Sequence, residues 1–466
     1  MLMSERVSIV DNQQKQGACP FNHENLTEEQ IAQLKSLPGS DGLPFVGETL
    51  NFISNPSGFA SQMTEKYGSP FYANVLGKNT IFFSGTEANR FIFAGENKYL
   101  QNNWSKPIRQ LLGKDSVSML SGENHRKRRA VLNPYFRYDR MDAFIPTIRT
   151  TIETHLEKWA TSGEMTLSMA NRDLTFEIIA RYIFGETDGL PVSELRDEFL
   201  TWTRGIFTMG IDLPFTRFGK AMQARERLWA KLTAIVEEYR KKDLSDCVLK
   251  SLFELRDEDG HPFSTSTIVD EIQVLLFAGH DTTVSALTNT LVLLAQHPGV
   301  VEKARQEQAE IDDNNLDTSK GLKNYPYLDA IINEGLRMHA PVTGAFRQMT
   351  GDRCLAGYHI PKDWAISVPI AGTLRNSDLW ENSDTFDPGR FMRDEHKKEA
   401  LMFIPFGGGP RLCLGQNFAL IVMRLTLALL FKDYSWELKP DQDLEVSILP
   451  TPLPKDGGLV TFRKLD

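Results

Sequence analysis

Residues 403–420 read FIPFGGGPRLCLGQNFAL and place one cysteine, Cys413, between a glycine-rich loop and an apolar helix. A cysteine at a helix start lies near backbone N–H groups that lack helical partners, and these groups favour the thiolate. Gly407 and its neighbours let the preceding loop approach closely, and Gly415 leaves one face without a side chain. Arg411 supplies a fixed guanidinium for a carboxylate. The pattern predicts a thiolate beside a flat ligand that carries carboxylates.

Taken alone, a cysteine in this position is more often a small buried side chain than a ligand. The ten positions from Phe406 to Gly415, however, match the pattern F-x-x-G-x-R-x-C-x-G, in which the chain resembles the cytochrome P450 family. The resemblance implies a mainly α fold, with a large helical domain, a small β-rich subdomain and haem b bound between two core helices. It also implies that Cys413 ligates the haem iron and that Arg411, Phe406, Gly407 and Gly415 lie at the cofactor.

Composition and net charge exclude some classes of protein. The chain has 466 residues, 41% hydrophobic and 24% charged, with a net charge of −9. Proteins that bind nucleic acid need clustered positive charge, so we do not expect this chain to bind nucleic acid. The N-terminal segment has neither the pattern of a signal peptide nor the roughly 20 apolar residues of a membrane span. We therefore expect a soluble, cytoplasmic protein with no integral membrane segment. The chain is further expected to be a monomer, with a flexible extension over residues 1–36 and a single haem domain over residues 37–466.

Apolar periodicity predicts the main elements. Helical spacing occurs in five long segments, at 141–160, 195–210, 225–242, 267–297 and 417–431. Two β-rich runs within 70–85 predict a hairpin with its turn at 77–79, and residues 453–465 predict a second hairpin.

The four cysteines, Cys19, Cys247, Cys354 and Cys413, have no paired spacing. They predict neither a disulfide framework nor a zinc site.

A Glu-x-x-Arg motif lies upstream of the cysteine. Glu334 and Arg337 stand three residues apart in a helical segment, where their side chains can pair. The resemblance implies that Arg390 completes a structural triad which fixes the chain around the haem. Gly389 stands where the family commonly has glutamate.

The segment FAGHDTT, residues 277–283, interrupts the most apolar predicted helix, which is about 45 Å long. Ala278 and Gly279 remove bulk from one turn, and Asp281 and Thr282 add exchangeable protons. Taken alone, Thr282 would bond to a carbonyl one turn earlier and Asp281 would reach water. The resemblance instead implies that Ala278 and Gly279 adjoin the haem, that Thr282 orients dioxygen, and that Asp281 relays protons from solvent.

Cations are expected at the haem propionates. The segment GENHRKRR resembles the family's W-x-x-x-R helix, with His125 in place of tryptophan and Arg129 as the arginine, and Arg347 matches another propionate contact. A charge run of this kind is usually a solvated helix face. Residues 126–128 are predicted to form part of a docking face for an acidic electron carrier. Because the sequence shows no flavin or iron–sulfur segment, the resemblance implies a separate ferredoxin or flavodoxin with its reductase.

Longer stretches at 37–52, 104–129 and 205–228 resemble the retinoic-acid hydroxylases of animals and their cyanobacterial relatives. The favoured substrates of that group are conjugated isoprenoid acids, so a lipophilic retinoid or other isoprenoid is the implied substrate. The resemblance assigns six residues to the pocket, each of which ordinary core packing would explain equally well: Trp104, Phe207, Ala278, Val342, Thr343 and Gly344.

The predicted activity is monooxygenation, the insertion of one oxygen atom of dioxygen into a C–H bond. A haem-thiolate peroxygenase, or an isomerase or dehydratase acting on fatty-acid-type substrates, is the first alternative. Some relatives of those kinds alter the acid–alcohol pair, which this chain keeps as Asp281 and Thr282. A non-enzymatic haem sensor is the second alternative, because Cys19-Pro20 resembles a short element of haem-regulated proteins.

Overall fold

The computed structural model describes residue 19 and residues 26–448 and 451–465, apart from 186–191, 207, 209, 245 and 257–259. Most of the predicted flexible extension, at 1–18 and 20–25, lies outside the described residues. The chain forms two compact units. Unit 1 comprises Met1–Phe83 and Gln348–Ile366, and unit 2 comprises Ser84–Arg347 and Ser367–Asp466. The single domain predicted from residue 37 onward stays a prediction.

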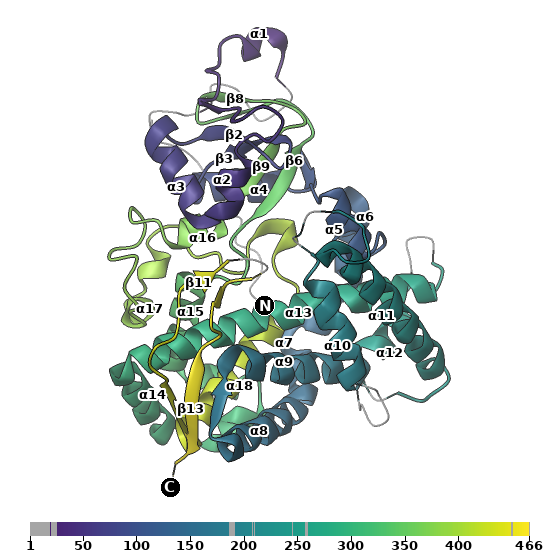
Figure 1. Ribbon diagram of the computed structural model, residues 1–466, viewed down its shortest axis with the longest axis vertical. Coiled ribbons are helices and arrows are strands. Elements are labelled where there is room, and N and C mark those ends of the chain that lie inside the picture. Colours follow the sequence, from purple (N-terminus) through teal and green to yellow (C-terminus); the bar gives the residue numbers. More distant parts are fainter. Residues whose placement is uncertain are drawn as a thin grey trace, which may run out of the picture. The chain divides into compact units, whose positions relative to one another are not determined.

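Unit 1 carries short helices and a small sheet (Figure 1). Its helices are α1 (Glu28–Ile31), α2 (Thr49–Ser54) and α3 (Pro56–Tyr67), and its strands are β1 (Gly39–Ser40), β2 (Phe71–Val75), β3 (Lys78–Phe82), β7 (Arg353–Leu355) and β8 (Tyr358–Ile360). Strand β2 pairs in parallel with β1 and antiparallel with β3, and β7 pairs antiparallel with β8. Phe59, Phe71 and Phe82 lie in the small core beneath the sheet.

The predicted β2–β3 hairpin is present, but its turn lies one residue earlier than expected. Leu76 and Gly77 both have positive φ, at 54° and 75°. Two such residues match the right-handed twist of the flanking strands, which is why two-residue hairpin turns adopt this conformation.

A disulfide joins Cys19 to Cys354 within unit 1. The prediction that the cysteines form no disulfide was therefore wrong. The two residues are 335 positions apart, so no local spacing could reveal the pair. Cys247 and Cys413 are free.

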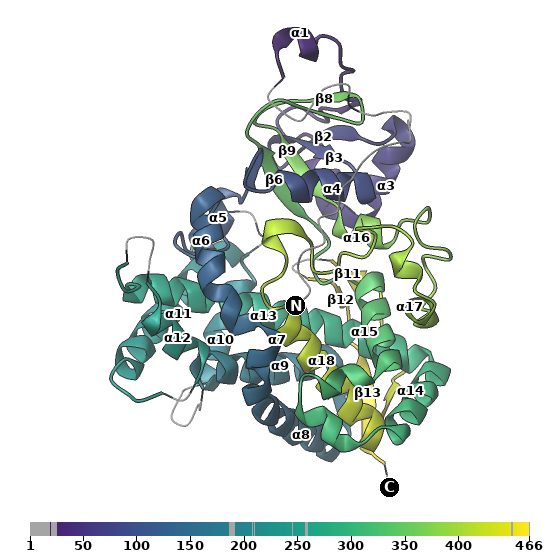
Figure 2. The same cartoon turned by 180° about the vertical axis from the view of Figure 1, so that it is seen from behind.

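Unit 2 is predominantly helical (Figures 1 and 2). Its helices are α4 (Thr86–Gly95), α5 (Lys106–Leu112), α6 (Gly122–Leu132), α7 (Tyr138–Met141), α8 (Ile145–Ser162), α9 (Leu167–Phe184), α10 (Val192–Thr203), α11 (Arg217–Tyr239), α12 (Val248–Glu254), α13 (Thr265–Gln296), α14 (Pro298–Glu310), α15 (Pro326–Met338), α16 (Ile370–Leu374), α17 (Gly389–Met392) and α18 (Gln416–Asp433). Its strands are β4 (Leu100–Asn102), β5 (Glu164–Thr166), β10 (Tyr434–Leu438), β11 (Val446–Ser447), β12 (Leu453–Pro454) and β13 (Leu459–Lys464). Strands β6 (Ala345–Met349) and β9 (Ala365–Val368) contain residues of both units.

The mainly helical character and the five long helices match the prediction, as α8, α10, α11, α13 and α18. The helix predicted over 195–210 ends earlier, at Thr203. The predicted C-terminal hairpin was wrong, because β13 pairs with β10 and β5 whereas β12 pairs with β11. Period-two patterns identify strands but do not specify distant partners.

Helix α13 crosses the middle of unit 2 and packs against α9, α11, α15 and α18 (Figure 1). Ser264 caps its start by accepting a hydrogen bond from the Thr267 N–H. Gly279 allows close approach to α9, because a Cβ atom there would lie 2.8 Å from Ile179 Cδ1. Such burial on nearly every side explains why the helix is apolar throughout.

The predicted Glu-x-x-Arg residues meet Arg390 in a buried cluster. The carboxylate of Glu334 accepts from Arg337 Nε and Nη2 at 2.7 and 2.8 Å and from Arg390 Nε at 3.0 Å. Arg337 also donates to the carbonyl of Ser383 at 2.7 Å. The cluster therefore ties α15 to α17 and to the loop before α17. Gly389 N–H donates to the Asp387 side chain instead of contributing a second acid.

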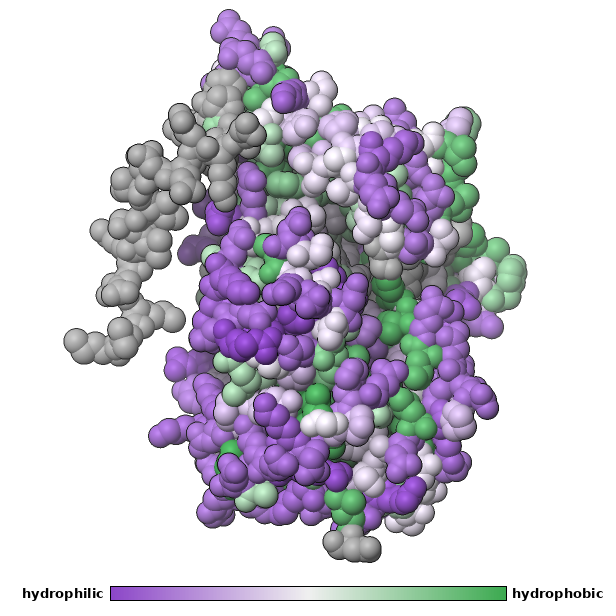
Figure 3. Space-filling model, turned by 90° about the vertical axis from the view of Figure 1, so that its left-hand side faces the viewer, coloured by the Kyte–Doolittle hydropathy of each residue, from purple (hydrophilic) through white to green (hydrophobic). Residues whose placement is uncertain are grey.

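The face of the molecule in Figure 3 carries mostly hydrophilic residues, with hydrophobic residues gathered toward the right of the view. Among the described residues, no helix has the length and apolar character needed to cross a membrane.

Candidate functional site

The glycine-rich loop before α18 is shaped by its packing on α4. Gly407 and Gly409 have φ of 70° and 62°, a region that favours glycine. A Cβ atom at Gly408 would lie 2.5 Å from the ring of Phe93 on α4, so only glycine fits there. The N–H of Cys413 donates to the carbonyl of Phe406 at 3.0 Å and closes the loop.

The thiol of Cys413 faces a hollow. Its side chain is exposed, yet burial raises the pKa of the thiol, and the opposing effects of the Gly415 N–H and the Arg129 guanidinium are smaller. A Cβ atom at Gly407 or Gly415 would meet no atom within 4 Å. The prediction that backbone N–H groups at the helix start and in the glycine loop lower this pKa was wrong, because desolvation outweighs them. The surrounding space nevertheless suits a flat ligand against the sulfur.

Helix α13 is buried along most of its length and is accessible at a short stretch near its middle. From Ile268 to Leu294 every residue is buried except Phe277, Ala278, Gly279 and Thr282. Positions 278 and 282 are one turn apart, so they share a face. The predicted dioxygen-orienting residue therefore lies on the accessible face of an otherwise enclosed helix.

Thr282 and Asp281 have different surroundings. The hydroxyl of Thr282 donates to the carbonyl of Ala278 at 2.6 Å, as expected for a threonine inside a helix. Asp281 is 3% exposed rather than in contact with bulk water, and its Oδ1 accepts from Arg172 Nη1 at 3.4 Å. Burial raises the pKa of Asp281 to about 6, and the Arg172 charge only partly opposes this shift. Because the Arg172 side chain is 22% exposed, it links the buried acid to the surface.

His280 is a buried neighbour of this acid that the sequence analysis did not select. Its Nδ1 lies 2.9 Å from the Thr175 hydroxyl, and its Nε2 lies 3.6 Å from Asp281 Oδ1. Burial lowers the pKa of His280 to about 3, so the imidazole is neutral at physiological pH. No sequence signal distinguished it from a core histidine.

Two of the predicted propionate residues meet at one carboxylate. Arg347 on β6 and Arg411 both donate through Nε to Glu96, at 2.5 and 2.6 Å. Arg129 on α6 donates to the carbonyl of Leu412 at 2.9 Å. Glu96, directly after α4, was missed because nothing in its local sequence marks it.

His125 lies beside these arginines and is neutral. Burial lowers its pKa to about 4, with further lowering by Arg411 and Arg129. Asn97 Oδ1 accepts a hydrogen bond from the Gly122 N–H at 3.0 Å, and this bond fixes the orientation of the side-chain amide. The amide nitrogen of Asn97 therefore faces His125 Nδ1 at 3.2 Å. His125 Nδ1 is then the acceptor and Nε2 carries the proton. The imidazole thus offers an N–H donor.

These residues fit a haem. Arg129 Nε is buried without a hydrogen-bond partner among the described residues, and in that part of the chain no carboxylate pairs with this arginine. Such a group is costly to bury, so it calls for an anionic partner. The open space at Gly415 and the donors at Arg347, Arg411 and His125 suit a flat molecule with carboxylates.

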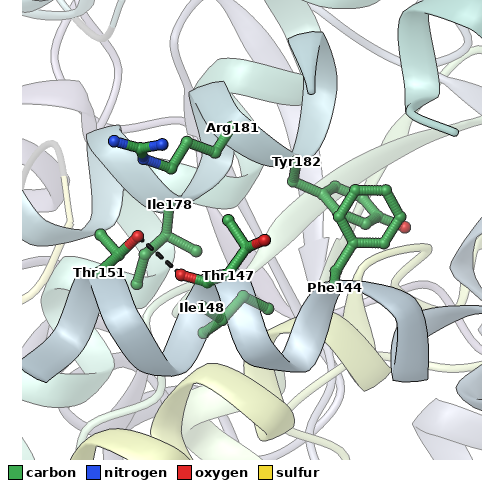
Figure 4. A pocket seen from close by; sticks show the side chains of 7 residues that line it. All are labelled: Phe144, Thr147, Ile148, Thr151, Ile178, Arg181 and Tyr182. Carbon is green, nitrogen blue, oxygen red and sulfur yellow. Dashed lines mark hydrogen bonds between the residues drawn. The ribbon is translucent and has the colours of Figure 1, made fainter. Parts of the chain in front are cut away.

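The predicted pocket residues are only partly defined. Trp104 Nε1 donates to the carbonyl of Ser118 at 2.9 Å, and the Thr343 carbonyl accepts from Ala371 N–H at 2.9 Å. Val342 is 42% exposed. Phe207 lies outside the described residues. A separate pocket between α8 and α9 contains none of the predicted site residues (Figure 4); it is lined by Phe144, Thr147, Ile148, Thr151, Ile178, Arg181 and Tyr182.

The predicted docking run 126–128 needs a correction. Arg128 forms an ion pair with the fully buried Glu271 and so holds α6 against α13. Arg126 pairs with Glu123 at the surface, and Lys127 is exposed. Arg126 and Lys127 therefore remain accessible to a partner, whereas Arg128 does not.

Comparison with known proteins agrees with the mainly helical fold. Residues 37–461 match the family model described as Cytochrome P450. The putative cytochrome P450 120 of Synechocystis is 37% identical over 431 residues, covering 92% of this chain and 97% of that protein. Human cytochrome P450 26B1 is 31% identical over 461 residues, covering 94% and 89%. The structure of retinoic acid-bound cyanobacterial CYP120A1 gives a TM-score of 0.87 at 37% identity, covering 93% of this chain and 100% of that one.

The raised pKa of Asp281 predicts a pH-dependent stability cost. The folded protein holds this proton up to about pH 6, against an ordinary pKa of 3.8, so stability falls as the pH rises from 3.8 to about 6 and the full cost is present above pH 6. We expect Asp281→Asn to raise the free energy of unfolding by up to about 3 kcal/mol at pH 8 and by about half as much at pH 5.

Chemical denaturation of the haem-loaded proteins at both pH values measures this effect. Asp173→Asn is the control, because Asp173 on neighbouring α9 pairs with Arg196 and is more exposed. A gain of equal size at both pH values, or a loss at pH 8, would contradict the placement of Asp281 as a desolvated acid.

Proposed function

The chain belongs to the cytochrome P450 family, and from this premise we propose that it hydroxylates a retinoid or another isoprenoid acid. Enzymes of the family are haem b monooxygenases that act on lipophilic substrates with dioxygen and electrons from a redox partner. The observation that carries the substrate proposal is the retinoic acid-bound CYP120A1 structure, which resembles this chain over 93% of its length. The sequence segments that resemble retinoic-acid hydroxylases point to the same class.

We assign the haem to residues of unit 2. Cys413 is the proposed iron ligand, with Phe406, Gly407 and Gly415 lining its side of the ring, and Ala278 and Gly279 are proposed for the opposite side. Arg129, Arg347, Arg411 and His125 are the proposed propionate partners. When bound, the haem supplies the oxidising chemistry. Support comes from the thiol's hollow, the accessible stretch of α13, and the buried Arg129 Nε without a partner.

Asp281 and Thr282 are proposed to deliver protons. A carboxyl with a pKa of about 6 can both take and release a proton near neutral pH, which is what a relay requires. Arg172 connects this carboxyl to the surface. The Thr282 hydroxyl lies on the accessible face of α13, so it can hold a proton at the hollow. The carbonyl of Ala278 keeps that hydroxyl oriented.

The electron donor is proposed to be a ferredoxin or flavodoxin that is reduced by its own reductase. This chain is proposed to act as a cytoplasmic monomer. An acidic carrier would meet exposed Lys127 and Arg126 on α6. Such an association is expected to weaken as salt screens the charges.

Titration of the ferric, haem-loaded protein with all-trans retinoic acid tests the substrate proposal. A ligand that displaces water from the haem shifts its absorption from the low-spin to the high-spin form. We expect a saturable shift with the retinoid, and none with a long-chain fatty acid or a cyclic terpene without a carboxylate. A shift with either comparator and not with the retinoid would contradict the retinoid proposal and leave the haem assignment intact.

Substitution of two adjacent threonines tests the proton route. Thr282 and Thr283 both donate to the carbonyl four residues earlier, at 2.6 and 2.7 Å, but Thr283 is buried. Positioned proton donors contribute about 10²–10⁴-fold, so we expect Thr282→Ala to lower product formed per reductant consumed at least about tenfold, with peroxide released instead. Thr283→Ala should keep this ratio. Equal ratios in the two variants would exclude the proposed role of Thr282.

A further inference from the structure

We propose that Glu96 is a positioning residue, which holds the guanidinium groups of Arg347 and Arg411 in place for the carboxylates of the haem. The inference depends on the haem site and is independent of the substrate proposal. None of the sequence motifs includes this residue.

The carboxylate of Glu96 joins two segments that are far apart along the chain. Its Oε2 accepts from Arg347 Nε at 2.5 Å across 251 residues, and its Oε1 accepts from Arg411 Nε at 2.6 Å across 315 residues. The Glu96 side chain is 3% exposed, and the two arginine side chains are 12% and 11% exposed. A charge-assisted bond on each oxygen fixes both guanidinium planes relative to one carboxylate.

The edges that Glu96 occupies leave other donors available. Arg347 Nη1 donates to the carbonyl of Phe346 at 3.0 Å, and Arg411 Nη2 donates to the carbonyl of Leu120 at 2.7 Å. Within the described part of the chain, Arg347 Nη2 and Arg411 Nη1 have no hydrogen-bond partner. Each arginine thus presents one terminal amino group to an incoming anion while Glu96 holds its inner edge.

Glu96 also offsets repulsion between the two cations. Burial lowers the pKa of Arg411, Glu96 opposes that shift, and the nearby charge of Arg347 adds to it. Without a carboxylate between them, two buried guanidinium groups would repel each other and move apart. Glu96 therefore keeps both arginines in place before the haem carboxylates arrive.

The next residue fixes Glu96 itself. Asn97 has a φ of 63°, and its side chain accepts from the Gly122 N–H and contacts His125 Nδ1. The segment after α4 is thereby attached to the start of α6. Because Glu96 is held in this way, its carboxylate is a fixed reference for arginines that arrive from two other segments.

The rate of haem loss separates positioning from general stabilisation. The haem-loaded protein is mixed with excess apomyoglobin at pH 8, and haem transfer is followed by absorption. In Glu96→Gln the amide offers only one acceptor, so its NH₂ group opposes one of the two Nε–H donors. We expect this variant to lose haem at least about tenfold faster than the unmodified protein.

Glu271→Gln is the matched control, because Glu271 is buried to a similar degree and pairs with Arg128, which is not among the predicted propionate residues. Burial raises the pKa of Glu271 to about 7, so pH 8 keeps it ionised. Both substitutions are expected to lower the unfolding temperature, whereas Glu271→Gln should change the rate of haem loss less than twofold. Equal rates of haem loss in the two variants would overturn the proposal.

Glu96→Asp decides the question if Glu96→Gln yields no haem-loaded protein. Aspartate keeps the charge, but its shorter side chain cannot reach both Nε atoms at the observed distances. Haem loss faster than in the unmodified protein supports positioning by Glu96. An unchanged rate would show that the charge alone suffices and would refute the proposal.

Discussion

The burial of α13 constrains the rest of unit 2. A helix enclosed on nearly every side must be apolar and must approach its neighbours closely, which Gly279 permits against Ile179. Because the helix is otherwise enclosed, its few accessible residues are informative. Accessible residues in the middle of such a helix mark a space inside the protein, and Thr282 lies on that face. The cost of placing Asp281 beside it, with a raised pKa, is the kind of strain that functional sites retain.

Buried charge follows a second rule in this structure. A cation removed from water needs an anionic partner, and α15, α13 and the segment after α4 each meet this need with one glutamate. Glu334 serves Arg337 and Arg390, Glu271 serves Arg128, and Glu96 serves two arginines at the site. Arg129 is the contrasting case, since no carboxylate among the described residues pairs with it. The lack of a carboxylate partner for Arg129 is the strongest electrostatic argument for an anionic cofactor.

Sequence patterns predicted what short stretches of chain determine. Helical periodicity located α8, α11, α13 and α18, and the glycines before Cys413 predicted a close loop, which packs on Phe93. The β2–β3 hairpin followed from alternation and a glycine turn. The motif residues Glu334, Arg337 and Arg390 were selected by family pattern, and the structure brings them into one cluster.

Features that depend on partners far apart along the chain could not be predicted from the sequence. Glu96 acquires its arginines across more than 250 residues, and Cys19 meets Cys354 across 335. The raised pKa of Cys413 results from surrounding protein that its helix position does not reveal. The partner of β13 and the ion pair that removes Arg128 from the surface are also set by packing. Local sequence determines which groups a segment carries, whereas the fold determines what those groups meet.

The most direct test of the account is the origin of the oxygen atom in the product. The haem-loaded protein is incubated with all-trans retinoic acid, NADPH, a ferredoxin and its reductase under ¹⁸O₂, and the product is analysed by mass spectrometry. A monooxygenase predicts a hydroxylated retinoid that carries one ¹⁸O atom and forms only with the carrier present. A product without ¹⁸O, or one that forms from added peroxide while the complete electron-transfer system gives none, would contradict the account.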